Sequence, residues 1–433
     1  MAHCNTIFHQ MLKLIPRHHF AKLEGEHSTG RKARSFTRWS QLVHLLSMQL
    51  TARVSLRDGV SSLKARIKSL YHLGVKPVAR STFADANHQR PASFFEALFG
   101  LMYRRCQPLA PKHKFKFKNK LFSLDATVVS LCLALFPWAS FRRTKGGIKL
   151  HILLDHDGYL PAFVAVSPAR EPEIKKARSL SRPKGSIVVE DLGYTDYAWY
   201  AQLTAQKIFF VTRQKRNARY EVLEHHKVNK SQGLLSDQTI QLTGAKSQEC
   251  LILLRRIAYR DAATGKRYVF LTNHFKLVAK TIADIYKERW QIEIFFRFIK
   301  QNLKIKAFIG NSENAVLTQI YAALIVYLLL CYLKFLCNLS ITLQNCIRIL
   351  QLNLFRTCTV QELFEPPEMI ADNMCHPKQL TLALAYPDRN DCKSLVNYQN
   401  DYFYMVISAI LGWSSMETKP FNTPFTINRT GRT

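Results

Sequence analysis

The stretch IKLHILLDHDGYLPAFVAV, residues 148–166, contains two runs of β-forming residues that meet at an Asp-Gly pair. Asp-Gly is a strong signal for a tight hairpin turn, because glycine readily adopts the positive backbone angles that such a turn needs. The stretch therefore predicts an antiparallel hairpin whose turn contains Asp157 and Gly158. The segments around this hairpin also have strand character, so we expect it to be part of a larger sheet.

The segment before the hairpin, LFSLDATVVSLCL at 121–133, is rich in β-formers. After the hairpin come a basic helical stretch, a buried-type strand, a helix and another strand, which ends near residue 213. Three strands followed by alternating helices and strands predict an α/β domain with a mixed sheet. Short strand-like runs between residues 215 and 272 predict a β-rich insertion before the chain becomes helical again.

The first hundred residues have the apolar spacing of helices. The run SLRDGVSSLKARIKSLYHLG, residues 55–74, begins at a serine suited to an N-cap and ends at a glycine suited to terminate a helix. A second helix is expected at 81–90, with Ser81 as its N-cap. The pair has the outline of a helix-turn-helix, although many helical hairpins share that outline. We expect an all-α DNA-binding module in residues 1–115, with the second helix facing DNA.

The chain carries a large positive charge. Its 433 residues are 47% hydrophobic, enough for two or three domains and too many for a disordered protein. Lys and Arg number 62 against 30 Asp and Glu, a formal net charge of +32. Such a surplus indicates a polyanionic partner, with nucleic acid as the first expectation and an anionic membrane as the competitor. Residues 1–120 alone hold 22 Lys and Arg against 5 Asp and Glu, which favours a binding role for them.

One segment keeps a basic membrane protein open as an alternative. Residues 315–333, AVLTQIYAALIVYLLLCYL, contain no charge and approach the length of a membrane span. Thr318, Gln319 and three tyrosines interrupt the segment, and the sequence offers no second one. We therefore expect a buried core helix and no membrane association.

The ten cysteines include no CxxC pair, so neither a zinc knuckle nor a disulfide framework is expected. The first 30 residues lack the uninterrupted apolar region of a signal peptide. Together these features predict reduced thiols and a cytoplasmic location.

Two acids stand where strands are usually apolar. Asp125 lies inside LFSLDATVV, and Asp191 ends SIVVED just before Gly193. A buried carboxylate is costly unless it is paired or bound to a cation, and Asp is disfavoured within strands. Each acid alone is explained by a bend or a turn. If the first and fourth strands are neighbours, however, the two acids meet, and a helix across the strand ends can add a third.

The third acid is Glu293, in the predicted helix YKERWQIEIFFRFIK at 286–300. A turn of 100° per residue places four polar side chains within roughly a 60° sector of a single helix: Tyr286, Arg289, Glu293 and Lys300. Taken alone, Arg289 and Glu293 are an ordinary i,i+4 pair on a solvated face, worth about 0.3 to 0.5 kcal/mol. Three converging carboxylates would instead form an oxygen cage for Mg²⁺ or Mn²⁺. Two such ions activate a water or a 3′-hydroxyl and stabilise the leaving oxygen of a phosphodiester.

The segments LDATVV, VVEDLGY and YKERWQIEIFFRFIK resemble the three acidic signatures of the bacterial insertion-sequence DDE transposases. The last one is specific to the insertion-sequence-four group, whose helix carries Y-(2)-R-(3)-E-(6)-K, and all four residues stand at that spacing. The resemblance implies an RNase H-like catalytic domain over 121–340 with a β-rich insertion at about 215–272. Residues 341–433 remain a helical or irregular C-terminal region of unknown role.

The resemblance also implies roles for the site residues. Asp125, Asp191 and Glu293 would form the catalytic triad that binds Mg²⁺ or Mn²⁺. Tyr286, Arg289 and Lys300 would contact DNA at the element's end. If the Glu293 carboxylate binds a metal ion, it cannot also pair with Arg289. A salt bridge between Arg289 and Glu293 is therefore not expected.

The function expected from this resemblance is cut-and-paste DNA transposition, by Mg²⁺-dependent cleavage at the element's ends followed by strand transfer. The partners would be double-stranded DNA of the terminal inverted repeats and of the target, with a homodimer in the synaptic complex. The protein would be cytoplasmic in a bacterium and associated with the nucleoid. Two alternatives stay open: an RNase H-like nuclease without strand transfer, and a catalytically inactive DNA-binding regulator.

Overall fold

The structure, a computed structural model, describes residues 5–28, 33–142, 145–180, 182–245, 247–305 and 307–364. Most of the predicted C-terminal region, residues 365–433, lies outside them. The first helices are α1 (Ile7–Lys13), α2 (Arg17–Glu26), α3 (Arg38–Leu50), α4 (Leu56–Lys64), α5 (Ile67–His72), α6 (Arg80–Gln89) and α7 (Ser93–Cys106). The later helices are α8 (Glu173–Arg178), α9 (Tyr197–Ala205), α10 (Ala279–Glu288), α11 (Gln291–Gln301), α12 (Glu313–Leu336), α13 (Leu343–Asn353) and α14 (Val360–Phe364).

The strands of the described part form a single mixed sheet. They are β1 (Leu121–Leu131), β2 (Ser140–Arg142), β3 (Lys145–Asp155), β4 (Leu160–Pro168), β5 (Ile187–Glu190), β6 (Phe209–Arg213), β7 (Tyr220–His226), β8 (Leu234–Leu242), β9 (Leu254–Arg260) and β10 (Arg267–Thr272). β1, β3 and β4 pair antiparallel, and β5 and β6 follow beside β1 in parallel. This order, β4-β3-β1-β5-β6, is that of an RNase H-like fold and confirms the predicted α/β class.

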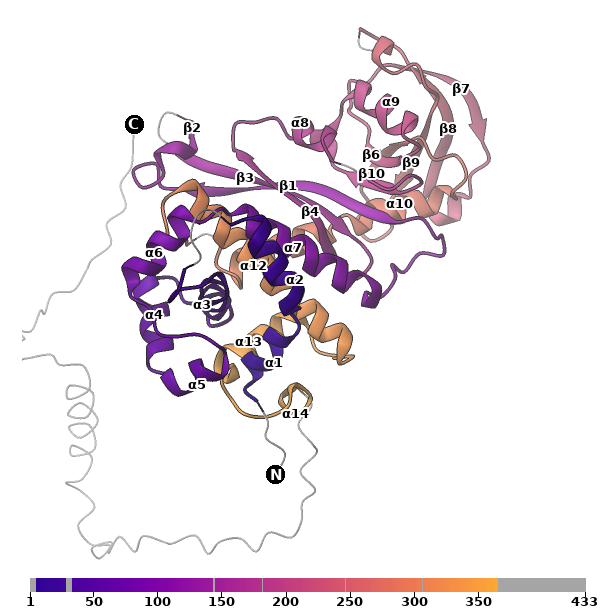
Figure 1. Ribbon diagram of the computed structural model, residues 1–433. Helices are drawn as coiled ribbons and strands as arrows, with labels where there is room; N and C mark the ends of the chain where they lie inside the picture. Colours follow the sequence, from indigo (N-terminus) through magenta and orange to yellow (C-terminus); the bar gives the residue numbers. More distant parts are fainter. Residues whose placement is uncertain are drawn as a thin grey trace, which may run out of the picture. The chain divides into compact units, whose positions relative to one another are not determined.

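The remaining strands extend the sheet at the β6 edge. β10 pairs antiparallel with β6, and β9, β8 and β7 follow in that order. The strands of residues 220–272 are the predicted β-rich insertion, inserted in sequence between β6 and α10. Figure 1 shows them at the far end of the sheet from β2.

The predicted hairpin is β3 and β4, joined by a turn that contains Asp157 and Gly158. Gly158 has a φ of +67°, which favours glycine, and a Cβ there would lie only 2.7 Å from the ring of Phe335 in α12. Tyr327 of the same helix donates a hydrogen bond to the carbonyl of Tyr159, at 2.9 Å. The turn is therefore fixed from both ends, by its own backbone and by the helix it meets.

Helices cover both faces of the sheet because the strand side chains alternate. Phe122, Val188 and their neighbours pack against α8 and α9 on one face. Leu121, Val189 and their neighbours pack against α10 on the other. Beyond them, the far halves of β1 and β3 pack against α11 and α12. The short strand β5 is buried at every position, as a central parallel strand requires.

The apolar segment at 315–333 is the central helix α12, as predicted. It is the one helix in the described ranges that is long and apolar enough to cross a membrane, and 89% of its most apolar window is buried inside the protein. α12 packs against α3, α6 and α7, so the N-terminal helices and the helical side of the sheet share one hydrophobic core. Figure 1 shows α12 among these helices, below the hairpin strands.

The expected helix at 55–74 is two helices. Ser55 is the N-cap, as predicted, and accepts a hydrogen bond from the backbone of Asp58. The chain then turns at residues 65–66 and resumes as α5, and Gly74 follows with a φ of +69°. The next helix, α6, starts one residue before Ser81, with Ala79 as its N-cap, so the predicted N-cap was wrong. Helix propensity predicts the presence of such helices well, but it predicts their first and last residues poorly.

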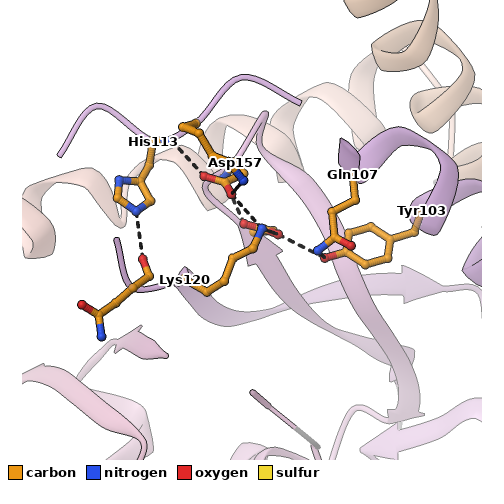
Figure 2. A network of polar contacts seen from close by, with 8 residues as sticks. Tyr103, Gln107, His113, Lys120 and Asp157 are labelled. Carbon is orange, nitrogen blue, oxygen red and sulfur yellow. Dashed lines mark hydrogen bonds and ion pairs between the residues drawn. The ribbon is translucent and has the colours of Figure 1, made fainter. Parts of the chain in front are cut away.

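The basic linker at 111–120 is tied to the turn of the hairpin (Figure 2). Lys120 Nζ lies 2.9 Å from Asp155 Oδ2 and 2.7 Å from Asp157 Oδ2, and both aspartates are almost completely buried. Tyr103 of α7 donates a hydrogen bond to Asp155 at 3.1 Å, and the backbone N–H of His113 donates one to Asp157 at 2.9 Å. Lys120 therefore joins the linker to the hairpin, and Asp155 joins the hairpin to the last N-terminal helix.

Candidate active site

Asp125 and Asp191 occupy equivalent positions on neighbouring parallel strands. The paired residues of β1 and β5 end at Leu124 and Glu190, which face each other across the ladder. Asp125 is the next residue of β1, and Asp191 is the first residue after β5. The two predicted acids, 66 positions apart in the sequence, are therefore adjacent at the carboxyl end of β5. Sites of open α/β sheets lie at such strand ends.

The local sequence explains how Asp191 is held. It caps the short turn after β5, where it accepts a hydrogen bond from the backbone N–H of Gly193. A Cβ on Gly193 would lie 3.0 Å from that carboxylate oxygen, so a residue with a side chain would crowd the acid. The glycine that follows the acid in sequence is thus part of the site.

Asp125 is largely buried, and its surroundings oppose its charge. Its pKa is raised to about 6, mainly by burial and to a smaller extent by the charges of Asp191 and Glu173. Arg289 and the backbone N–H of Ala126, which donates to Asp125 Oδ1 at 2.7 Å, lower the pKa but do not outweigh burial. A carboxylate in this position is stabilised by any additional cation.

The predicted helix at 286–300 has a break at its centre. Residues 286 to 293 are linked by i→i−3 hydrogen bonds across the break, from Arg289 N to Tyr286 O and from Glu293 N to Trp290 O. This tightened turn separates α10 from α11, so the single helix that was expected is wrong. Tyr286 belongs to α10, whereas Glu293 and Lys300 belong to α11. Tight turns inside a helix often mark functional sites.

Arg289, at the break, joins two of the three predicted acids. Its Nη1 lies 3.0 Å from Asp125 Oδ2, and its Nη2 lies 2.9 Å from Glu293 Oε1. Burial alone would lower the pKa of Arg289, but Asp125 and Glu293 outweigh it and hold the pKa above the ordinary value. The i,i+4 pair that we did not expect is therefore present, as one half of a bridge from α11 to β1.

The other two residues of the signature also lie beside the acids. Lys300 donates hydrogen bonds to the hydroxyl of Thr127 and, at 3.1 Å, to the carbonyl of Val128, both in β1. The ring of Tyr286 packs on Phe270 with 4.9 Å between centroids, and burial raises its pKa. The six predicted site residues thus lie along the middle of β1, at the end of β5 and at the break between α10 and α11.

The acids suit a divalent cation in chemistry, since Mg²⁺ and Mn²⁺ prefer carboxylate oxygens. A cation, the guanidinium of Arg289, already lies between Asp125 and Glu293. Among the described residues, no three His, Cys, Asp or Glu side chains are arranged closely enough to hold a metal ion as they stand. Binding a metal at Asp125 and Glu293 therefore requires Arg289 to move away from these oxygens.

Two acids near the site were not identified from the sequence. Glu173, at the start of α8, lies beside the Gly193 turn. Glu190 is completely buried, and neither of its carboxyl oxygens has a hydrogen-bond partner. Burial raises the pKa of Glu190 well above its ordinary value, and Arg182 only partly offsets this. Glu190 could have been found from the sequence, because it is an acid within a strand that is otherwise apolar. No feature of the sequence pointed to Glu173.

Glu190→Met is expected to stabilise the protein, because it removes a buried carboxyl group without partners. An unpaired buried polar group costs about 1 to 3 kcal/mol, so unfolding should become harder by about that amount. The raised pKa means that the folded protein binds a proton the unfolded chain releases. Wild-type stability should therefore fall as the pH rises above 4.5, the ordinary value of a glutamate, and the variant's advantage should grow.

The measurement is the free energy of unfolding of both proteins in denaturant at several pH values. Glu190→Gln, which keeps the size and polarity but removes the charge, should show a smaller gain. A destabilised Glu190→Met that loses folded structure at neutral pH would show that the carboxyl group has a partner after all.

Comparison with known proteins identifies the family of the chain. A family described as the transposase DDE domain matches residues 116–329, and a domain of unknown function matches residues 3–76. A putative transposase of Sinorhizobium fredii is 31% identical over 307 residues, which are 69% of this chain and 85% of that protein. The probable transposase of insertion sequence element IS5377 from Geobacillus stearothermophilus is 30% identical over 58% of this chain and 67% of its own length.

These matches define the class: the chain belongs to the DDE transposases. More particularly, it is a transposase of an insertion sequence element. A putative transposase for element IS4SA from Synechocystis is a further relative, 27% identical over 64% of this chain and 77% of that protein.

A solved structure, the cryo-EM structure of a piggyBac transposase synaptic complex with hairpin DNA, covers 81% of this chain and 78% of its own. Its sequence identity is 10% and its TM-score 0.41, so the fold assignment above rests on the strand order alone.

Proposed function

We propose that this transposase moves its element by cut-and-paste transposition, with Asp125, Asp191 and Glu293 as the metal-binding triad. The observation that carries the proposal is the meeting of these residues from three distant segments. Asp125 and Asp191 stand at equivalent places on paired strands, and one guanidinium links Asp125 to Glu293. Cleavage of the element's end DNA in the presence of Mg²⁺ is the direct test.

The three acids and Arg289 each have a role in this proposed mechanism. Asp125 in β1 and Asp191 directly after β5 would each supply a carboxylate ligand, and Glu293 would supply the third from α11. A divalent cation held by these residues would activate a water or a 3′-hydroxyl and stabilise the leaving oxygen. Arg289, displaced from the acids, is then within reach of the phosphates that flank the cleaved bond.

Charge and exposure support DNA as the partner of the N-terminal helices. The surplus of 22 Lys and Arg over 5 Asp and Glu in residues 1–120 suits phosphate contacts. Helix α6 buries Phe83, Ala86 and Asn87 and leaves its other face exposed, including Arg80 and His88. We propose that this polar face of α6 reads the terminal inverted repeat, as the second helix of a helix-turn-helix would.

The reaction needs two copies of the chain, because two element ends must be held together before either is joined to target DNA. We therefore propose a homodimer in the synaptic complex, acting in the bacterial cytoplasm on nucleoid DNA.

Arg289→Ala and Lys300→Ala should each preserve the fold and metal binding but weaken binding or processing of the element's end. Charge-assisted hydrogen bonds to phosphate are worth about 1 to 3 kcal/mol each, so the loss should be about 5- to 150-fold. The measurements are the melting temperature, end binding and end cleavage of the same purified variants.

Arg297→Ala is the matched control, because Arg297 is an exposed cation of the same helix and lines a pocket whose lining includes none of the three acids. It should leave cleavage unchanged. If both Arg289→Ala and Lys300→Ala cleave normally and only lose some melting temperature, the contacts of Arg289 and Lys300 have a purely structural role.

A further inference from the structure

A fourth carboxylate lies at the site. Glu173 is the first residue of α8, on the opposite face of the sheet from α11. A Cβ placed on Gly193 would be 3.0 Å from Asp191 Oδ1 and 3.5 Å from Glu173 Oε2, so both oxygens border the same point above the turn. The charge of Glu173 also acts on Asp125. It therefore approaches the two strand acids from the side that Glu293 does not occupy.

A buried lysine holds Glu173 in this orientation. Lys149 of β3 places Nζ 3.2 Å from Glu173 Oε1, and the same Nζ donates a hydrogen bond to the carbonyl of Glu171 at 3.0 Å. The side chain of Lys149 is only 12% exposed. One oxygen of Glu173 is thus occupied by the lysine, and the other, Oε2, is left facing the turn that holds Asp191.

A buried phenol without a partner supports a ligand at this place. Tyr194, in the same turn, is completely buried, and its hydroxyl has no hydrogen-bond partner among the described residues. The carboxylates of Glu173, Asp125, Glu190 and Asp191 all lie near enough to act on it electrostatically. A buried hydroxyl usually has a partner, so the Tyr194 hydroxyl is available to donate a hydrogen bond to an oxygen ligand bound beside these carboxylates.

We propose that Glu173 is a fourth carboxylate of the metal site, whose Oε2 binds the divalent cation held by Asp125 and Asp191 or a water of its shell. The proposal rests on the proposed function, because it uses the same metal. Lys149 is then a positioning residue that fixes the Glu173 side chain, and Tyr194 donates its hydroxyl hydrogen to the ordered oxygen shell. Such outer ligands commonly change metal affinity by about 10- to 100-fold.

The test is a calorimetric titration of the full-length protein with Mn²⁺ alone. Glu173→Gln should weaken Mn²⁺ binding by about 10- to 100-fold. Glu171→Gln makes the same change two residues away, where the carboxylate pairs with Lys175, and should leave binding unchanged. Lys149→Met breaks the same ion pair but keeps the Glu173 carboxylate, so it should weaken Mn²⁺ binding less than Glu173→Gln does. Melting temperatures of all variants report any loss of fold.

If Glu173 serves only the ion pair with Lys149, Glu173→Gln and Lys149→Met will lower the melting temperature alike and neither will change Mn²⁺ affinity. That result overturns the inference. Asp125→Asn separates it from the proposed function: loss of Mn²⁺ binding there, with normal binding by Glu173→Gln, refutes only the fourth carboxylate. Mn²⁺ binding that no variant changes, Asp125→Asn included, refutes the metal site itself.

Discussion

Asp125→Asn, Asp191→Asn and Glu293→Gln are each expected to abolish cleavage of the element's ends, by more than about a thousandfold. A bound divalent ion contributes several kcal/mol to the transition state of phosphodiester cleavage, and 1.4 kcal/mol corresponds to a factor of about ten. Binding of the end should remain, because phosphate contacts rather than the metal dominate the affinity for DNA. The measurements are cleavage and binding of the same labelled DNA end.

Asp284→Asn is a suitable control, since Asp284 is a half-exposed acid of α10 that pairs with Lys280 four residues earlier. It should cleave normally. Substantial cleavage by any one of the three site variants would show that its residue is not a member of the catalytic triad.

Lys120→Met is expected to give the largest loss of stability, about 3 to 5 kcal/mol in the free energy of unfolding. It leaves Asp155 and Asp157 buried with the main part of their countercharge removed (Figure 2), and breaking a buried pair from one side has about this cost. Burial alone would lower the pKa of Lys120, but the two aspartates outweigh it and raise the pKa. Denaturant unfolding at neutral pH measures the effect.

Lys112→Met is the matched control. Lys112 also pairs with Asp157, at 3.1 Å, but its side chain is 77% exposed, and exposed pairs contribute about 0 to 1 kcal/mol. Equal losses for the two lysines would contradict the importance given to burial. Lys120, Lys112 and the His113 N–H lower the pKa of Asp157 against burial, so its contribution exists above pH 3.8 and disappears on acidification.

The strand acids were predictable because two simple rules act on them together. Asp125 and Asp191 each break the apolar pattern of a strand, and an α/β order of elements makes the first and fourth strands neighbours. The Asp157-Gly158 turn was equally local, and so was the buried character of α12.

The contacts across the chain were not predictable. Periodicity places Arg289 and Glu293 on one side of a helix, but it does not reveal the tight turn at residues 289–290 or the ion pair to Asp125. Glu173 reads as one charge in a basic stretch, and only the packing of α8 brings it to the Gly193 turn. The roles of these side chains in binding metal or DNA stay predictions.

The arrangement of the helices was also beyond the sequence pattern. Residues 1–115 and the catalytic segment look separable because their compositions differ, yet α12 returns to pack between α3 and α7. The linker lysine Lys120 looks like one more solvated charge, whereas it is the partner of two buried aspartates. Long-range packing of this kind depends on tertiary contacts that local propensity does not encode.

The central claim is that Asp125, Asp191 and Glu293 cut and join DNA at the ends of the element. The most direct measurement is to incubate the purified full-length protein with duplex DNA of its own element end, a target plasmid and Mg²⁺, and to map the products. We predict cuts at the end of the element that leave a 3′-hydroxyl, and joined products in the target. Cuts without joined products would identify a nuclease without strand transfer. Intact DNA, with the wild type indistinguishable from Asp125→Asn, would contradict the account.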